Sequence, residues 1–344
     1  MSAPAPERPA APTLAPTTTP TPISVKPNAT PAAPAPPGRL RTLAADWRAR
    51  FAFLAVVWGF SFLFIKLGTE GYAPFQVALG RVFFGALTLL TVLAVRRERL
   101  PRSARVWAHL TVASIFLNTV PFALFAYAEL RIPSTLAGIC NATSPLWGMV
   151  LSMVALSEDR PTRRRVAGLG LGFLGVLIVL GAWQGFAGVD PLGTALALLA
   201  SICYPIGWIW VRRTLADTGH SPVSLTAGQL LSATAQLLVV SLLFTEAPAG
   251  IPLWPTLSVI ALGSLGTGVA MLMQYGLVNE VGPTTAQMVT YFIPVIAVAA
   301  GVLVLGEHLT WNTPVGAAVV LAGAFLTQSR PTGPRPAARP ARTG

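Results

Sequence analysis

Charged side chains are scarce in this chain, and their scarcity excludes most soluble folds. Only 10% of the 344 residues are charged, whereas 53% are hydrophobic. Soluble domains carry about 25% charged residues. A bilayer admits only helices or closed barrels, and the apolar segments here are long enough to cross a core of about 30 Å as helices. We therefore predict an all-α integral membrane protein.

Acidic residues are few, and none lies mid-membrane. The twelve of them fall in tails, in loops or at the ends of apolar segments. Proton-coupled carriers commonly use a buried carboxylate as the proton relay. The sequence therefore favours facilitated diffusion or substrate exchange over carboxylate coupling, and coupling through Glu129 or His109 is the alternative.

The chain has only two cysteines and three histidines, which are few ligands for a metal or redox site. Cys140 and Cys203 lie inside apolar segments, which indicates packing rather than a disulfide or a metal pair, and the histidines are widely scattered. A membrane-embedded enzyme would need a nucleophile–base pair, an acidic pair or a metal cluster within the spans. The sequence shows none of these, so we predict a protein that is not an enzyme and needs no cofactor.

The net charge of +12 is concentrated in arginines of the tails and of the loops between apolar segments. In a soluble protein such a charge would suggest nucleic acid. In a membrane protein, arginines in loops set the orientation of the chain instead. We therefore expect the lipid bilayer and a small-molecule substrate as partners, expect no nucleic acid, and make no prediction of oligomeric state.

Ten apolar segments follow one another between two proline-rich tails. Residues 1–45 and 330–344 have a composition that builds no core, and are predicted to be disordered cytoplasmic tails. The predicted spans are 49–67, 74–95, 106–128, 134–156, 163–182, 190–211, 222–244, 254–277, 283–305 and 312–329. Partner docking by the long tail would suit an alternative function, a membrane scaffold or sensor without transport. Deletion of residues 1–45 would abolish that function and leave transport intact.

One two-helix pattern occurs twice, at an offset of 149 residues. Each copy has a proline early in an apolar run and a glutamate at the end of that run. The matched residues are Pro145 with Pro294 and Glu158 with Glu307. A chain that repeats a unit at half its core length is predicted to contain two copies of one module, here two five-helix repeats at 46–182 and 183–329.

The loop arginines predict the orientation of the spans. With the N-terminus in the cytoplasm, eleven loop arginines lie on the inner side and only Arg131 on the outer side. Both termini are therefore predicted to be cytoplasmic, in a multi-pass protein of the plasma (cell inner) membrane. Because five spans is an odd number, the second repeat enters inverted. Many secondary transporters have this arrangement, with the substrate site between the repeats near the midplane.

Several motifs, in this order and spacing, resemble the EamA domains of the drug/metabolite transporter superfamily. They are Trp58-Gly59-Phe60-Ser61-Phe62 with Lys66, Arg81-Val82-Phe83, Ser144-Pro145-Leu146, Pro294, and Leu305-Gly306-Glu307-His308-Leu309. The first half departs from the family pattern, with Leu156-Ser157-Glu158-Asp159 where the family usually has Leu-Gly-Glu. The resemblance covers residues 50–329 and implies export or exchange of small metabolites by alternating access, without fixing a substrate.

A glycine pattern at Gly170–Gly175 matches the dinucleotide motif GxGxxG. That motif requires a strand before it and a helix after it, whereas here it lies within one apolar span. We therefore predict that Gly168, Gly172 and Gly175 serve close helix packing.

Polar residues at helical spacing predict a central cavity lined by the third, fourth, eighth and ninth spans. In the eighth span Thr267 and Gln274 share one face, and the repeat offset pairs this face with Asn118 and Phe125 of the third. The alternative is hydrogen bonding between helices, worth only about 0.6–2 kcal/mol per contact. The candidate substrate-binding residues are Trp58, Arg81, Asn118, Phe125, Asn141, Thr267, Gln274, Gln287, Thr290 and Tyr291.

Arg81 is a membrane-embedded cation for which the sequence leaves two roles open. It can attract an anionic substrate group such as a carboxylate, or it can snorkel outward or pair with Glu129. The repeat places Gln229 at the equivalent position of the second half. A cavity of amides, hydroxyls and at most one or two cations suits neutral or zwitterionic molecules, such as amino acids, better than multivalent cations.

Four matched residues are predicted to break or gate helices. Pro145 and Pro294 each free a backbone carbonyl one turn earlier, which can line a cavity or permit bending. Glu158 and Glu307 lie at helix ends on opposite membrane sides, so we interpret them as caps or gates rather than as a coupling site.

Overall fold

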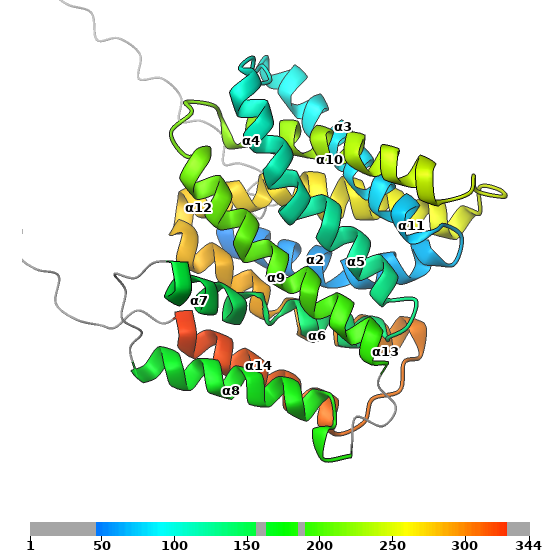
Figure 1. The fold of residues 1–344 in the computed structure, drawn as a ribbon, viewed down its shortest axis with the longest axis vertical. Coiled ribbons are helices and arrows are strands. Elements are labelled where there is room, and N and C mark those ends of the chain that lie inside the picture. Colours follow the sequence, from blue (N-terminus) through cyan, green and yellow to red (C-terminus); the bar gives the residue numbers. More distant parts are fainter. Residues whose placement is uncertain (1–45, 156–162, 185–189, 329–344) are drawn as a thin grey trace, which may run out of the picture. The chain divides into compact units, whose positions relative to one another are not determined.

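The computed structural model describes residues 46–155, 163–184 and 190–328, and their regular structure is helical (Figure 1). The first half contains α2 (Trp47–Thr69), α3 (Pro74–Arg96), α4 (Ala104–Ser114), η1 (Ile115–Thr119), α5 (Val120–Ala128), α6 (Ser134–Asn141), α7 (Ser144–Ala155), α8 (Arg163–Val179) and η2 (Ala182–Gln184). The second contains α9 (Pro191–Thr214), α10 (Pro222–Phe244), α11 (Leu253–Gly263), η3 (Ser264–Val269), α12 (Ala270–Gln287), η4 (Met288–Tyr291), α13 (Ile293–Leu305) and α14 (Asn312–Gln328). Glu158 and both predicted tails lie outside the described residues.

Seven described segments are long and apolar enough to cross a membrane. They are Trp47–Thr69, Pro74–Arg96, Ala104–Ala128, Pro191–Thr214, Pro222–Phe244, Leu253–Gly282 and Met288–Leu305. Two further apolar helices, Val166–Val179 and Asn312–Leu326, are shorter. The all-α membrane class is therefore confirmed, whereas this count by length and composition does not reach the predicted ten spans.

The fourth predicted span is two helices rather than one. α6 and α7 are separated at Ala142 and Thr143, where the Thr143 hydroxyl donates to the Cys140 carbonyl at 2.6 Å. Pro145 is the second residue of α7, and Pro294 is the second residue of α13. Proline is tolerated in the first turn, where its missing N–H would have no partner in any case. Both prolines therefore lie where a helix begins.

Two π-helical turns interrupt the third and eighth predicted spans. η1 and η3 begin at Ile115 and Ser264, which are separated by the repeat offset of 149 residues. π-Helical turns are rare and frequently lie at functional sites. The two halves therefore share an irregularity at the same position, which the sequence pattern did not predict.

Gly282 separates the eighth predicted span from the ninth. Its φ of 82° lies inside the stretch assigned to α12, and a residue without a Cβ adopts this angle at little cost. The helical direction therefore changes at Gly282.

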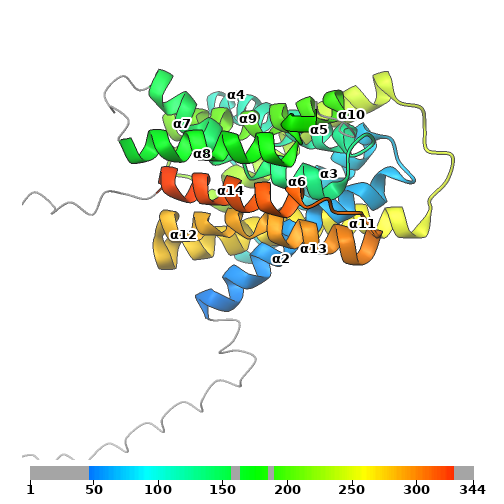
Figure 2. The ribbon, with the colours of Figure 1, turned by 90° about the horizontal axis from the view of Figure 1, so that it is seen from below.

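α8 and α14 lie side by side in both ribbon views (Figures 1 and 2). A Cβ on Gly175 would lie 2.5 Å from the Val320 nitrogen, and one on Gly316 would lie 2.6 Å from the Val179 nitrogen. Side chains at these glycines would therefore force the helix backbones apart. A Cβ on Gly323 would likewise overlap Gly172 and Gly168, so Gly168, Gly172 and Gly175 serve close helix packing as predicted, whereas a Cβ on Gly170 would meet nothing within 4 Å.

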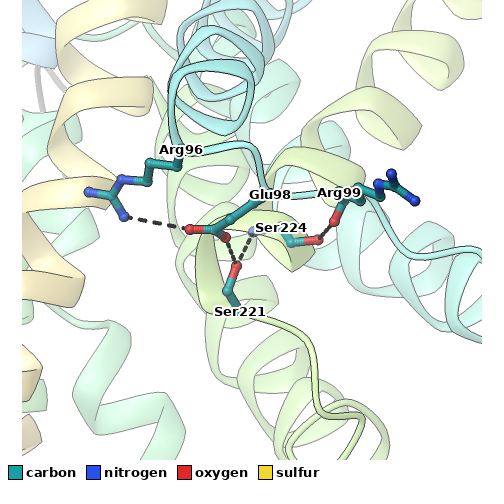
Figure 3. Close-up of polar contacts among 5 residues, drawn as sticks. All are labelled: Arg96, Glu98, Arg99, Ser221 and Ser224. Atoms are coloured by element: carbon teal, nitrogen blue, oxygen red, sulfur yellow. Dashed lines mark hydrogen bonds and ion pairs between the residues drawn. The ribbon is translucent and has the colours of Figure 1, made fainter.

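α3 and α10 run antiparallel and are joined at both ends. Where α3 ends, the Ser221 hydroxyl donates to the Glu98 carboxylate and the Ser224 hydroxyl donates to the Arg99 carbonyl at 2.8 Å (Figure 3). At the other end, the Gln76 amide donates to the Glu246 carbonyl at 2.7 Å. These contacts hold in register the two helices that carry Arg81 and Gln229.

Candidate substrate site between the two halves

Arg81 joins the two halves through its guanidinium group. The side chain projects from α3, and its Nε donates to the Thr267 hydroxyl of η3 at 3.1 Å. Its Cζ lies 3.7 Å from the centroid of the Phe122 ring, within the range of a cation–π contact. Thr267 is 1% exposed, whereas Arg81 is only partly buried. The cation is therefore held in place and keeps part of its surface open.

Gln229 makes the corresponding contact from the second half. Its amide nitrogen, in α10, donates to the side-chain oxygen of Asn118 in η1. Gln229 is the repeat equivalent of Arg81, and Asn118 is that of Thr267. In each half, a side chain of a regular helix therefore donates to the π-helical turn of the other half. The donor is the cation Arg81 in the first half and the neutral amide of Gln229 in the second.

The π-helical turn at η3 has backbone carbonyls that accept side-chain donors. The Trp58 indole donates to the Gly266 carbonyl of η3 at 3.2 Å, and the Thr267 hydroxyl donates to the Leu262 carbonyl, in the last turn of α11, at 3.3 Å. Because a π-helical turn breaks the regular i to i−4 hydrogen-bond ladder, its carbonyls need such partners. Trp58, Arg81 and Thr267 are thus brought together at η3, as members of one predicted site.

Phe125 lies in the hydrophobic core beside this cluster. It is 1% exposed, meets Phe62 edge to face at 5.4 Å between centroids, and stacks on Tyr204 at 6.5 Å. Phe125 is therefore a core residue and presents no surface to a substrate.

The other predicted site residues lie on separate elements. Asn141 ends α6, Gln274 lies in α12 and Thr290 lies in η4, each partly buried. The Tyr291 hydroxyl donates to the Ala324 carbonyl at 2.9 Å, and its ring meets Phe325 of α14, so Tyr291 points toward α14. The side chain of Gln287 lies outside the described side chains.

Glu307 caps a helix of the opposite half. Its carboxylate accepts the backbone N–H groups of Ser134 and Thr135, at 2.7 and 3.0 Å, where α6 begins. A carboxylate at a helix N-terminus also interacts favourably with the helix dipole. Close by, the Lys66 ammonium donates to the backbone carbonyl of Glu129. The ends of α2, α5 and α13 and the start of α6 therefore meet on one side of the protein.

Glu129 follows α5 directly and has no exposed surface. Neither of its carboxylate oxygens has a hydrogen-bond partner among the described residues. Burial raises the pKa of Glu129 well above its ordinary value, with Lys66 and Arg81 lowering it and Glu307 raising it. The sequence pattern identified Glu129 as a residue at a helix end but could not show its complete burial, which depends on how distant segments pack.

The chain matches the EamA-like transporter family twice, over residues 49–181 and 191–328. Similar proteins include the uncharacterized transporter YoaV of Bacillus subtilis, 24% identical over 79% of this chain and 93% of its own length. The uncharacterized inner membrane transporter YedA of Escherichia coli is 28% identical over 79% of this chain and 87% of its own. A protein of Salmonella typhimurium named as a probable amino-acid metabolite efflux pump is 25% identical over 79% and 91%.

One solved crystal structure shares the fold, with a TM-score of 0.59 at 19% identity, covering 82% of this chain and 96% of that one. The relatives are named as transporters, and the apolar helices place the chain among multi-pass membrane proteins. The two family matches cover most of the chain, and the protein therefore belongs to the EamA-like transporter family.

Proposed function

We propose that this protein is a secondary transporter that exports or exchanges small metabolites, with amino acids and related compounds as the substrate class. It works by alternating access across the plasma membrane. The observation that carries this proposal is the crossed pair of contacts, Arg81 to Thr267 and Gln229 to Asn118, in which each half holds the irregular turn of the other. Sites between repeats near the membrane midplane are common in secondary transporters.

The proposed architecture is ten spans in two inverted five-helix repeats, at 46–182 and 183–329, with cytoplasmic termini. The double family match supports two copies of one module. The antiparallel pairing of α3 with α10 supports inversion, because these two helices are repeat equivalents. The common offset of η1 and η3 supports the same conclusion.

The proposed substrate carries a carboxylate. The partly buried guanidinium of Arg81 presents donors that match a carboxylate in a fork-like geometry. At the equivalent position, Gln229 and Asn118 offer amide groups that suit a neutral or amino group. Amino acids have both features, and the name of the Salmonella relative agrees. We propose that Trp58, Asn141, Gln274, Gln287, Thr290 and Tyr291 contribute to the path of the substrate.

Counterflow in proteoliposomes tests the proposal. Vesicles loaded with an unlabelled amino-acid mixture should accumulate external radiolabelled amino acids through the wild-type protein. Arg81→Gln should lower this accumulation at least tenfold, because it installs the residue of the equivalent position and keeps a donor for Thr267 while removing the charge. Arg50→Gln is the matched control, since Arg50 pairs with the exposed Glu280 away from this cluster. Equal counterflow by wild type and Arg81→Gln would refute the role of Arg81.

A further inference from the structure

We propose that Glu129 is a proton-binding site of this transporter, closed off from water by a gate at the ends of α2, α6 and α13. The proton on Glu129 exchanges with water only when that gate opens, so proton movement is tied to the conformational cycle. The link to transport rests on the proposed function, whereas the proton site itself stands on the geometry described below.

The burial of Glu129 requires a bound proton. The side chain has no exposed surface, and both of its oxygens lack a hydrogen-bond partner among the described residues. Removing an ion from water without compensating hydrogen bonds costs several kcal/mol in real proteins, so a carboxyl group in such a place takes up a proton instead. In the closed arrangement Glu129 is therefore a neutral acid.

Ionisable groups from several elements surround Glu129. Lys66 of α2, Arg81 of α3 and Glu307 after α13 act on it electrostatically. The pair of Arg131 and Asp190, 3.4 Å apart, lies beyond Ala128, where the start of α9 packs.

The carboxylates of the neighbouring acids have hydrogen-bond donors, unlike that of Glu129. Glu307 accepts two backbone N–H groups, and Asp190 accepts from Arg131 and from the Gly193 N–H. Of these three carboxylates, Glu129 is the one whose oxygens accept no hydrogen bond from the described residues. It is therefore the acid best suited to hold a proton.

Arg81 of α3 contacts the face of α5 that leads to Glu129. Phe122, on which Arg81 stacks, precedes Glu129 by seven residues, which is two helical turns and about 10 Å along the axis. A rearrangement that brings Glu129 closer to Arg81 or Lys66 stabilises its ionised form. The site therefore holds a proton in one arrangement and can release it in another.

The gate consists of two contacts between elements far apart in the sequence. Glu307 binds the backbone N–H groups of Ser134 and Thr135, and Lys66 binds the backbone carbonyl of Glu129 itself. When these contacts separate, water reaches Glu129. Its O–H bond then breaks, the proton passes to water, and the carboxylate is left hydrated. Protonation reverses the step, and no other bond changes.

Infrared spectroscopy of the full-length protein in vesicles of phosphatidylethanolamine and phosphatidylglycerol tests the proton site. At pH 7 the wild type should show the C=O band of a protonated carboxyl group, and Glu129→Gln should lack that band. Glu280→Gln should keep it, because Glu280 is an exposed acid paired with Arg50. Identical bands in wild type and Glu129→Gln at pH 7 would overturn the proposal.

Transfer of the same vesicles to heavy water tests the gate, because replacement of the carboxyl proton by deuterium shifts the band. We expect slow exchange in the wild type and at least tenfold faster exchange in Glu307→Ala and in Lys66→Met, which each remove one gate contact. Equal rates in all three proteins, or immediate exchange in the wild type, would disprove the gate. Amino-acid counterflow is measured separately. If counterflow is absent, the proposed substrate class is wrong, and the infrared bands still test the proton site.

Discussion

Thr267 and Arg81 form a part-buried contact between the two halves. Thr267 is 1% exposed, and its hydroxyl accepts the Nε hydrogen of Arg81 at 3.1 Å. Hydrogen bonds to charged groups contribute about 1.5–3 kcal/mol each, and loss of a buried partner leaves the charged group with its full desolvation cost. The stability of the protein should therefore depend on this single hydroxyl.

Thr267→Val should lower the free energy of unfolding by about 1.5–3 kcal/mol, because valine has the shape of threonine but offers no acceptor to Arg81. The measurement is the thermal unfolding midpoint in detergent, which requires no substrate. Thr267→Ser, which keeps the hydroxyl, is the control and should unfold close to the wild type. If the valine variant is as stable as the serine variant, the hydrogen bond does not contribute in solution.

Residue types could be predicted from the sequence, but their partners could not. The repeat offset matched Thr267 with Asn118 and Arg81 with Gln229, which are equivalent residues of the two halves. The structure pairs Arg81 with Thr267 and Gln229 with Asn118, which are not equivalents. An offset relates copies of one module, whereas contacts depend on how the two copies pack. The burial of Glu129 escaped prediction for the same reason.

At the scale of elements, helical segments could be predicted but their interruptions could not. The break at Ala142 and Thr143 divides a segment that is apolar throughout, and hydropathy does not distinguish one helix from two. The π-helical turns IFLNT and SLGTGV have no shared composition that would mark them. At two of these interruptions a neighbouring helix donates to a backbone carbonyl, Trp58 to Gly266 at η3 and Ser201 to Cys140 before the break.

The close approach of α8 and α14 predicts opposite effects of the same substitution at two glycines. A Cβ on Gly323 would overlap the backbone of Gly172, whereas a Cβ on Gly170 meets nothing within 4 Å. Overpacking typically costs about 1–3 kcal/mol, and replacement of glycine by alanine within a helix gains about 1 kcal/mol. Gly323→Ala should therefore destabilise the protein, and Gly170→Ala should leave it unchanged or stabilise it.

Unfolding in mixed micelles of increasing denaturing detergent measures both glycine variants. The comparison controls for helix propensity, because both variants make the same chemical change in a helix. If Gly323→Ala proves as stable as Gly170→Ala, α8 and α14 are not in close backbone contact in the membrane.

At the scale of the whole molecule, the loop arginines and the repeat offset predict on which side each loop lies. Equivalent loops of an inverted pair must lie on opposite sides of the membrane. The loop after α3 and the loop after α10 are such equivalents, and Ser103 and Gly250 are exposed in them. A Cβ on Gly250 meets nothing within 4 Å, so a side chain fits there without strain.

Single cysteines at these two positions separate inversion from orientation. In a background with Cys140→Ala and Cys203→Ala, a membrane-impermeant thiol reagent added to intact cells should label Gly250→Cys but not Ser103→Cys, and permeabilised cells should show both labelled. Ser103→Cys leaves the arginines of its loop in place, so the orienting charge is unchanged. Labelling of both from outside would contradict the inverted repeat. Labelling of Ser103→Cys alone would preserve inversion and place both termini outside. The arginines of the loop after α3 would then not orient the chain.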